Sequence, residues 1–233
     1  MSGPPRTAIV TGGASGIGHA SARLLADRGV QVAVLDVNGP EPVDVSDEGS
    51  VNAAVSRVRA SLGPIGIVVN CAGLPAGGRM DSEDYLVSWR RSLEVNLTGA
   101  MLVVRACIDD LVASGAGRIV NVASTEAISA GRDTGPYTVA KHALLGYTRT
   151  LAVDYGRLGV TANCVCPGAT LTGMTMRIPE ADRAAFARRN IPVGRYARPE
   201  EIAFMVVTLT DPAASFVNGA VVVVDGGMTT QGR

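Results

Sequence analysis

Tyr137 and Lys141 are the two side chains of this sequence whose types and spacing most directly suggest chemistry. Residues four apart share one face of a helix, so a phenol and an ammonium at these positions can contact one ligand together. A phenol is a poor base at neutral pH, but a positive charge beside it favours the phenolate, which can accept a proton. The pair therefore predicts a proton-transfer site.

Lys141 is the single lysine of the chain, in which lysines and arginines together number 21. A compact ammonium can sit beside both a phenol and a ribose, whereas a planar guanidinium is wider and differently oriented. The alternative is an ordinary solvated lysine on a helix. The use of lysine at this place alone favours the functional interpretation.

A glycine-rich turn, TGGASGIG at residues 11–18, separates the first predicted strand from the first predicted helix. Glycines let the backbone approach a pyrophosphate closely, and the helix N-terminus supplies free N–H groups and a positive dipole. Many such turns need glycine only for positive φ, but this one opens a βαβ unit. We therefore predict a dinucleotide-binding turn. The predicted contacts are Gly12, Ser15, Gly16, Ile17 and Gly18.

Asp36 ends the second predicted strand, which is where a ribose-binding acid belongs in such a unit. A carboxylate accepts hydrogen bonds from both ribose hydroxyls but repels a 2′-phosphate. Neither Ser15 nor Val37 supplies a cation that would bind that phosphate. Asp36 therefore predicts NAD as the cofactor in preference to NADP.

Composition and charge exclude several other classes of function. The 233 residues carry no formal net charge and no long run of one sign, so we expect neither nucleic acid nor an anionic membrane as a partner. The four cysteines lack a CxxC spacing or neighbouring histidines, which predicts reduced thiols and no metal site. The sequence contains no Gly-Lys-Ser/Thr, so it lacks the motif of a P-loop nucleotide-binding protein. Without an apolar run before the first strand, or one long enough for a membrane span, we expect a cytoplasmic protein.

Short β-branched runs alternate with longer helical patterns, which is typical of a parallel sheet wrapped by helices. Strands are predicted at residues 7–11, 31–36, 65–70, 118–123, 160–165 and 220–225. Helices are predicted at residues 16–28, 46–62, 82–114 (as one piece or two), 135–157, 180–189 and 199–210. Because no repeat or linker interrupts the pattern, we expect one α/β domain over residues 1–233, with a doubly wound Rossmann-type sheet of about seven strands.

Several ordered motifs together resemble the short-chain dehydrogenase/reductase family from about residue 6 to residue 227. The turn at residues 11–18 matches that family's TGxxxGIG, residues 137–141 its YxxxK pair, and residues 225–227 its common ending. Ser124, thirteen residues before Tyr137, falls on the catalytic serine.

This resemblance implies a role for each of several residues around a nicotinamide cofactor, which performs the hydride transfer. Ser124 would hydrogen-bond the reacting oxygen, and Tyr137 would take the proton in alcohol oxidation or give it in carbonyl reduction. Lys141 would bind the nicotinamide ribose. Asn96, in a Val-Asn-Leu sequence, resembles the helix asparagine that holds a proton-relay water.

The resemblance also implies further cofactor contacts on three segments. Asp44 and Val45 resemble the residues that contact adenine. Asn70, Ala72 and Gly73 belong to a segment that resembles the family's NNAG strand end. The segment that holds the nicotinamide carboxamide is matched by Pro167, Gly168, Thr170 and Thr172.

The chain departs from the family pattern at two places. Only residues 37–43 separate Asp36 from Asp44, and two prolines there forbid the helix that the family usually has. We expect a missing crossover helix before Asp44, a stub of edge strand near residues 43–45 and a more open adenine pocket. Cys71 replaces the second asparagine of NNAG, from which we expect a modest effect on stability and none on chemistry.

We expect the substrate to be a small-molecule alcohol or ketone, and its identity stays open between a secondary alcohol, a dihydrodiol and a 3-oxoacyl compound. Residues 173–198 should close over the pocket, with Met174, Met176 and Ile178 as an apolar wall. Arginines in this segment could meet an acidic carrier or form a solvated helix face. They are Arg177, Arg183, Arg188 and Arg189.

An alternative function is a catalytically silent nucleotide sensor or scaffold on the same fold. The intact set of Asn96, Ser124, Tyr137 and Lys141 argues against it. The helices at residues 99–114 and 137–155 resemble those through which the family assembles, so a homotetramer or homodimer is expected.

Overall fold

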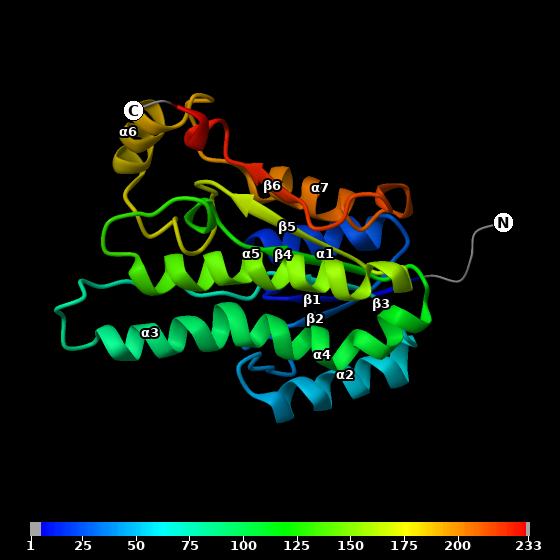
Figure 1. The fold of residues 1–233 in the computed structure, drawn as a ribbon. Coiled ribbons are helices and arrows are strands. Elements are labelled where there is room, and N and C mark those ends of the chain that lie inside the picture. The colour runs from blue at the N-terminus through cyan, green and yellow to red at the C-terminus, as the bar shows by residue number, and fades with distance from the viewer. Residues whose placement is uncertain (1–5, 232–233) are drawn as a thin grey trace.

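The computed structural model describes residues 6–231, so both ends of the predicted 1–233 domain lie outside the described residues. Its centre is one sheet of six parallel strands in the order β2-β1-β3-β4-β5-β6 (Figure 1). The strands are β1 (Thr7–Thr11), β2 (Gln31–Leu35), β3 (Ile65–Asn70), β4 (Arg118–Val122), β5 (Thr161–Pro167) and β6 (Val221–Val224). The strand order reverses between β1 and β3, and a dinucleotide site is expected at such a switch point.

Helices cover both faces of the sheet, as the doubly wound prediction requires (Figure 1). The helices are α1 (Gly16–Asp27), α2 (Glu48–Leu62), α3 (Tyr85–Leu93), α4 (Gly99–Ala113), α5 (Gly135–Tyr155), α6 (Glu180–Asn190) and α7 (Pro199–Thr208). One hydrophobic cluster joins α2, α4 and α5 to one face of the sheet. A second cluster joins α1 and α7 to the other face.

The central strands are buried on both faces, which explains their continuous apolar sequences. Every residue of β1, β4 and β5 is buried. The side chains of each strand alternate between the two clusters, so that Ile9 belongs to the α4 side and Val10 to the α1 side. This packing fixes the carboxyl ends of the strands side by side, where the predicted site residues lie.

The prediction of about seven strands was wrong, because the expected stub at residues 43–45 forms no strand. The N–H of Val43 donates to the carbonyl of Asp36 at 3.0 Å, so the chain folds back on itself instead of pairing with the sheet. The side chains of Val43 and Val45 are buried in the core. The missing crossover helix is confirmed, since residues 36–47 contain no helix.

Several helix boundaries differ from the predicted ones by one to three residues. The helix α2 starts at Glu48 because Asp47 is its N-cap and accepts the N–H of Ser50 at 2.5 Å. The region predicted as one helix or two contains α3 and α4, joined without a break by a π turn at Glu94–Thr98. Such π turns are rare and are frequent at functional sites.

Candidate active site

The glycine turn has the shape that a bound pyrophosphate needs. Gly12 has φ +64°, and a Cβ there would lie 2.8 Å from the backbone of Ala72, at the end of β3. A Cβ on Gly18 would collide with the carbonyl oxygen of Gly12. The helix α1 begins at Gly16 directly after this turn. The backbone therefore forms a cradle without side chains, over a helix N-terminus, which fits the phosphates of a dinucleotide.

Asp36 lies at the edge of this cradle. One carboxylate oxygen accepts the N–H of Ala14 in the turn at 3.0 Å, and the other accepts the N–H of Asn38 at 2.9 Å. The predicted acid and the predicted turn, 22 residues apart in sequence, are thus in direct contact. The negative charge stands where an adenosine ribose would lie next to the phosphates.

The predicted adenine residues have separate roles in the structure. Asp44 accepts the hydroxyl of Ser46 at 2.6 Å, and Arg91 on α3 approaches the other carboxylate oxygen at 3.7 Å. The Ser46 hydroxyl and N–H, with the Arg91 guanidinium, lower the pKa of Asp44 below its ordinary value. Val45 is buried, and its side chain would lie 2.7 Å from a Cβ at Gly99. The predicted adenine contact Asp44 is therefore a carboxylate held in one orientation.

At the end of β3, the structure places the three predicted residues differently. The side chain of Asn70 is 3 % exposed and donates to the Asn121 side chain at 2.8 Å, so it points into the helix layer and away from the cradle. Ala72 packs against Gly12 through its backbone. A Cβ on Gly73 would lie 2.7 Å from Asn96 Oδ1 and 3.5 Å from Lys141 Nζ, so this glycine joins the cradle to the catalytic residues.

Tyr137 and Lys141 lie together, as their spacing predicts. The helix α5 begins at Gly135, so both residues stand in its first two turns. Lys141 Nζ is 5.5 Å from the centroid of the Tyr137 ring and donates to the carbonyl of Val122 at 3.0 Å. Lys141 is 4 % exposed. A buried ammonium is costly unless it is partnered, so its place beside a phenol indicates a functional use.

Ser124 follows β4 with an extended backbone, φ −173° and ψ 164°. Its Oγ accepts the N–H of Glu126 at 3.1 Å, which begins a short 3₁₀ turn over Thr125–Ala127. Because this bond uses a lone pair, the hydroxyl proton of Ser124 stays available to a ligand oxygen.

Asn96 lies within the π turn and is 1 % exposed. Its Oδ1 accepts the N–H of Leu74 at 3.2 Å, and its Nδ2 donates to the carbonyl of Leu74 at 3.1 Å. The side chain thus holds the loop after β3 against the helix layer. The π turn, in which the N–H of Gly99 bonds to the carbonyl of Glu94, shifts the backbone ladder at this residue.

The segment after β5 lies against the end of β6 and the glycine turn. A Cβ on Gly168 would lie 2.7 Å from the Asp225 side chain, so the chain passes close to the end of β6. The hydroxyl of Thr170 donates to the carbonyl of Gly168 at 3.0 Å. Thr172 reaches the glycine turn, with its Cγ2 3.2 Å from a Cβ placed on Gly16. Pro167 ends β5 and aligns this segment with the other strand ends.

Ser92 is a site residue that the sequence reasoning missed. It is fully buried in α3, donates to the carbonyl of Pro136 at 3.0 Å and accepts from Asn96 Nδ2 at 3.3 Å. Ser92 therefore links the asparagine to the residue just before Tyr137. A serine inside a predicted amphipathic helix was the only signal, and such residues commonly bond to the backbone of their own helix instead.

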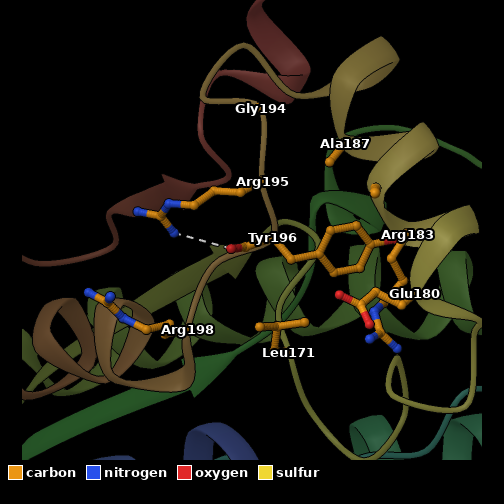
Figure 2. Close-up of a pocket in the computed structure, with 9 residues that line it drawn as sticks. Leu171, Glu180, Arg183, Ala187, Gly194, Arg195, Tyr196 and Arg198 are labelled. Atoms are coloured by element: carbon orange, nitrogen blue, oxygen red, sulfur yellow. Dashed lines mark hydrogen bonds between the residues drawn. The ribbon is translucent and has the colours of Figure 1, made fainter.

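Two hollows lie on the surface, and the segment predicted to close over the substrate lines one of them. One of about 550 Å³ is lined by Arg79, Met80, Asp81 and Asp133, and none of the four predicted catalytic residues lines it. The other, of about 350 Å³, lies between α6 and the segment that enters α7 (Figure 2). Arg183 lines this second hollow, and its Nη1 donates to the carbonyl of Ile178 at 2.6 Å. Arg183 thus holds the segment before α6 in place, whereas Arg177, Arg188 and Arg189 are exposed.

Over residues 6–231, no group of histidines, cysteines and acids could hold a metal ion. None of the helices described is long and apolar enough to span a membrane.

The fold and the site define a Rossmann-type oxidoreductase with a serine, tyrosine and lysine at the carboxyl ends of its strands. A family model described as enoyl-(acyl carrier protein) reductase matches residues 12–229. The chain belongs to the short-chain dehydrogenase/reductase family, as its motifs predicted. It is an NAD(P)-dependent enzyme that transfers a hydride between nicotinamide and an alcohol or carbonyl carbon.

Several of the similar proteins are dehydrogenases that match almost the whole chain. The chain is 39 % identical to cis-4-hydroxycyclohexanecarboxylate dehydrogenase from Sinomonas cyclohexanicum, over 96 % of each chain. It is 36 % identical to D-threitol dehydrogenase from Mycolicibacterium smegmatis, over 96 % of this chain and 93 % of the relative. The structure of Thermoplasma acidophilum aldohexose dehydrogenase is similar with a TM-score of 0.92 and 30 % identity, over 98 % of this chain and 95 % of that one.

Proposed function

We propose that this protein is an NAD-linked dehydrogenase that oxidises a cyclic secondary alcohol to the ketone. The observation that carries the proposal is the buried Lys141 ammonium, 5.5 Å from the Tyr137 ring and next to the glycine cradle. A bound nicotinamide would supply the acceptor for the hydride. Every other part of the reaction is performed by side chains of this chain.

In the proposed mechanism, the hydroxyl of Ser124 donates a hydrogen bond to the substrate oxygen and so holds that oxygen near Tyr137. The phenolate of Tyr137 removes the proton of the substrate hydroxyl as the carbon is oxidised. Lys141 stabilises that phenolate by its charge and binds the ribose hydroxyls. Asn96 anchors a water molecule that links Lys141 to solvent. In the reverse direction, Tyr137 returns the proton to a carbonyl oxygen.

Two features support NAD as the cofactor. The carboxylate of Asp36 contacts the glycine turn, so a 2′-phosphate on the adenosine ribose would meet a negative charge. Both hydrogen bonds that the Asp36 carboxylate accepts come from backbone N–H groups and not from a cationic side chain. A similar structure, a gluconate 5-dehydrogenase from Burkholderia cenocepacia J2315 at 30 % identity, was determined with NADP and tartrate, so the choice needs a direct test.

A cyclic alcohol is favoured by the similar proteins and by the apolar side chains of the segment before α6. Relatives at 37 % and 32 % identity are a 2,5-dichloro-2,5-cyclohexadiene-1,4-diol dehydrogenase from Sphingobium indicum and a cyclohexanol dehydrogenase from an Acinetobacter species. Met174, Met176 and Ile178 are exposed on the segment before α6, where they can cover an apolar ring. The guanidinium of Arg183 donates to backbone carbonyls of its own segment. This weakens the alternative in which Arg183 binds an acidic carrier.

The test is a screen of cyclohexanol, cis-cyclohexane-1,2-diol, cis-4-hydroxycyclohexanecarboxylate and a 3-oxoacyl thioester by nicotinamide absorbance. We expect oxidation of a ring alcohol with NAD, and a loss of about 10³-fold in kcat/KM for Tyr137→Phe. Tyr155→Phe, at the other end of α5, is the matched control and should retain activity. NAD should raise the melting temperature more than NADP does at equal concentration.

Two outcomes would contradict this function. Full activity of Tyr137→Phe would remove the tyrosine from the mechanism. If NAD binds but no substrate is turned over by the wild-type protein, the silent nucleotide sensor becomes the better function.

A further inference from the structure

Ser124 and Tyr137 must act on one oxygen atom, yet the chain between them has little regular structure. Residues 128–134 form no helix or strand. Asp133, just before α5, is the one residue other than glycine with positive φ in the described chain, at +59°. Such a conformation costs energy and persists only when surrounding contacts hold it. Some other contact must therefore fix the distance between the two catalytic hydroxyls.

Glu126 contacts both sides of this gap. Its backbone N–H donates to Ser124 Oγ at 3.1 Å. Its carboxylate Oε2 accepts the hydroxyl of Thr138, the neighbour of Tyr137, at 2.6 Å. A single residue thus joins the serine turn to the first turn of the tyrosine helix.

The same carboxylate oxygen also holds the connecting loop. It accepts the N–H of Gly131 at 2.9 Å, and the hydroxyl of Thr134 lies within 3.1 Å. Thr134 is the residue that precedes α5, so the negative charge sits at the positive end of the helix dipole. A Cβ on Gly131 would lie only 2.8 Å from the other carboxylate oxygen, so the loop closes tightly around this side chain.

The opposite side of the helix start has a brace of its own. Ser92 on α3 donates to the carbonyl of Pro136 at 3.0 Å. With Ser92 on one side and Glu126 on the other, the first turn of α5 is held between two layers of the fold. Ser92 is not bonded to the serine turn. Lys141 also ties α5 to the end of β4 through the carbonyl of Val122, but Glu126 is the residue whose own bonds reach both Ser124 and the first turn of α5.

We infer that Glu126 is a positioning residue for the proposed reaction, whose carboxylate sets the separation of the Ser124 and Tyr137 hydroxyls by bonding to Thr138 and Gly131. The inference rests on the proposed function. Glu126 acts as a hydrogen-bond acceptor at a fixed place, and its charge is secondary. Removing the acceptor lets the loop and the first turn of α5 shift, and a misplacement of about 1 Å can cost about 100-fold in rate.

The test compares Glu126→Ala, Glu126→Gln and the control Glu48→Ala. Glu48 is also an acid in the first turn of a helix and pairs with Arg105 at 3.3 Å, and it is far in sequence from Ser124 and Tyr137. We expect Glu126→Ala to lower kcat by about 10- to 100-fold, with the Kd for NAD within about twofold of wild type. Glu126→Gln keeps a carbonyl acceptor and should regain most of kcat, whereas Glu48→Ala should leave kcat unchanged.

A second measurement separates positioning from simple loss of stability. Hydrogen–deuterium exchange should quicken in peptides that cover residues 129–139 of Glu126→Ala, and not in Glu48→Ala. Normal kcat in Glu126→Ala overturns the inference, even if its melting temperature falls. If Glu126→Gln is as slow as Glu126→Ala, charge and not the hydrogen-bond brace is responsible, and the inference is again wrong. Failure of the wild-type enzyme on every substrate would instead sink the proposed function itself.

Discussion

At the glycine turn the backbone forms the surface proposed for the dinucleotide, whereas around Tyr137 and Lys141 buried polar side chains form the proposed catalytic site. Gly12 and Gly18 leave no room for a Cβ, and the cradle owes its shape to this close approach. Asn96 and Lys141 are instead almost fully buried and bonded to backbone groups of other segments. A phosphate can be bound by N–H groups that any residue carries, but proton transfer needs particular side chains. Those side chains are costly to bury, so each must have partners.

The largest expected effect would come from filling the cradle. Gly12→Ala forces a Cβ to within 2.8 Å of the Ala72 backbone, whereas Gly29→Ala, at φ +79°, has nothing within 4 Å of its Cβ. Gly29→Ala should therefore cost about 1–2 kcal/mol in the free energy of unfolding, from its backbone conformation alone. Gly12→Ala should cost more and raise the Kd for NAD at least tenfold. Chemical denaturation and calorimetric titration measure both.

Equal losses in the two glycine variants would break the comparison, because only the sign of φ and not the close approach would then matter. Normal NAD binding by Gly12→Ala would show that the backbone at this turn does not form the binding surface.

An intermediate effect is expected at Asp36, whose carboxylate accepts a hydrogen bond from the glycine turn. Asp36→Asn keeps an acceptor for the N–H of Ala14 but removes the charge that repels a 2′-phosphate. The ratio of kcat/KM for NADP to that for NAD should rise by about 10- to 100-fold, the range given by unit charges close together near a protein surface. Asp27→Asn, an exposed change of the same kind at the end of α1, is the control. An unchanged ratio would remove Asp36 from cofactor selection.

The smallest effect concerns Cys71, which lies at the end of β3 between the two regions. Burial raises the pKa of the Cys71 thiol to about 12, and the nearby Lys141 ammonium lowers it only in part. Because the thiolate is the reactive form, alkylation of Cys71 by iodoacetamide should quicken about tenfold per pH unit from pH 7 to pH 10. Mass spectrometry of the Cys71 peptide follows this rate. A plateau of the alkylation rate near pH 9 would mean that the thiol ionises as in water. Burial would then not affect the thiol at this strand end.

Some of the predictions made from the sequence depend on local rules, and the structure agrees with these predictions. The glycine turn, the strand–helix alternation and the Tyr137–Lys141 spacing follow from backbone sterics and from the period of a helix. The prolines after Asp36 predicted the missing crossover helix for the same local reason. The homotetramer or homodimer and the cytoplasmic location stay predictions.

Other features depend on contacts between residues far apart in the chain. The sequence could not show that Val43 would bond back to Asp36 and leave the sheet with six strands. It could not show that Asn70 would turn toward Asn121, 51 residues away.

The amino-acid sequence by itself determined the fold class, the order of the elements and the residue types at the site, because these follow from rules that act within a few residues. Only the tertiary structure decided which polar side chains face the cleft and which brace it, as Ser92 and Glu126 do. The physical reason is that a buried hydrogen-bonding group must take whichever partner the packing of distant elements brings within about 3 Å.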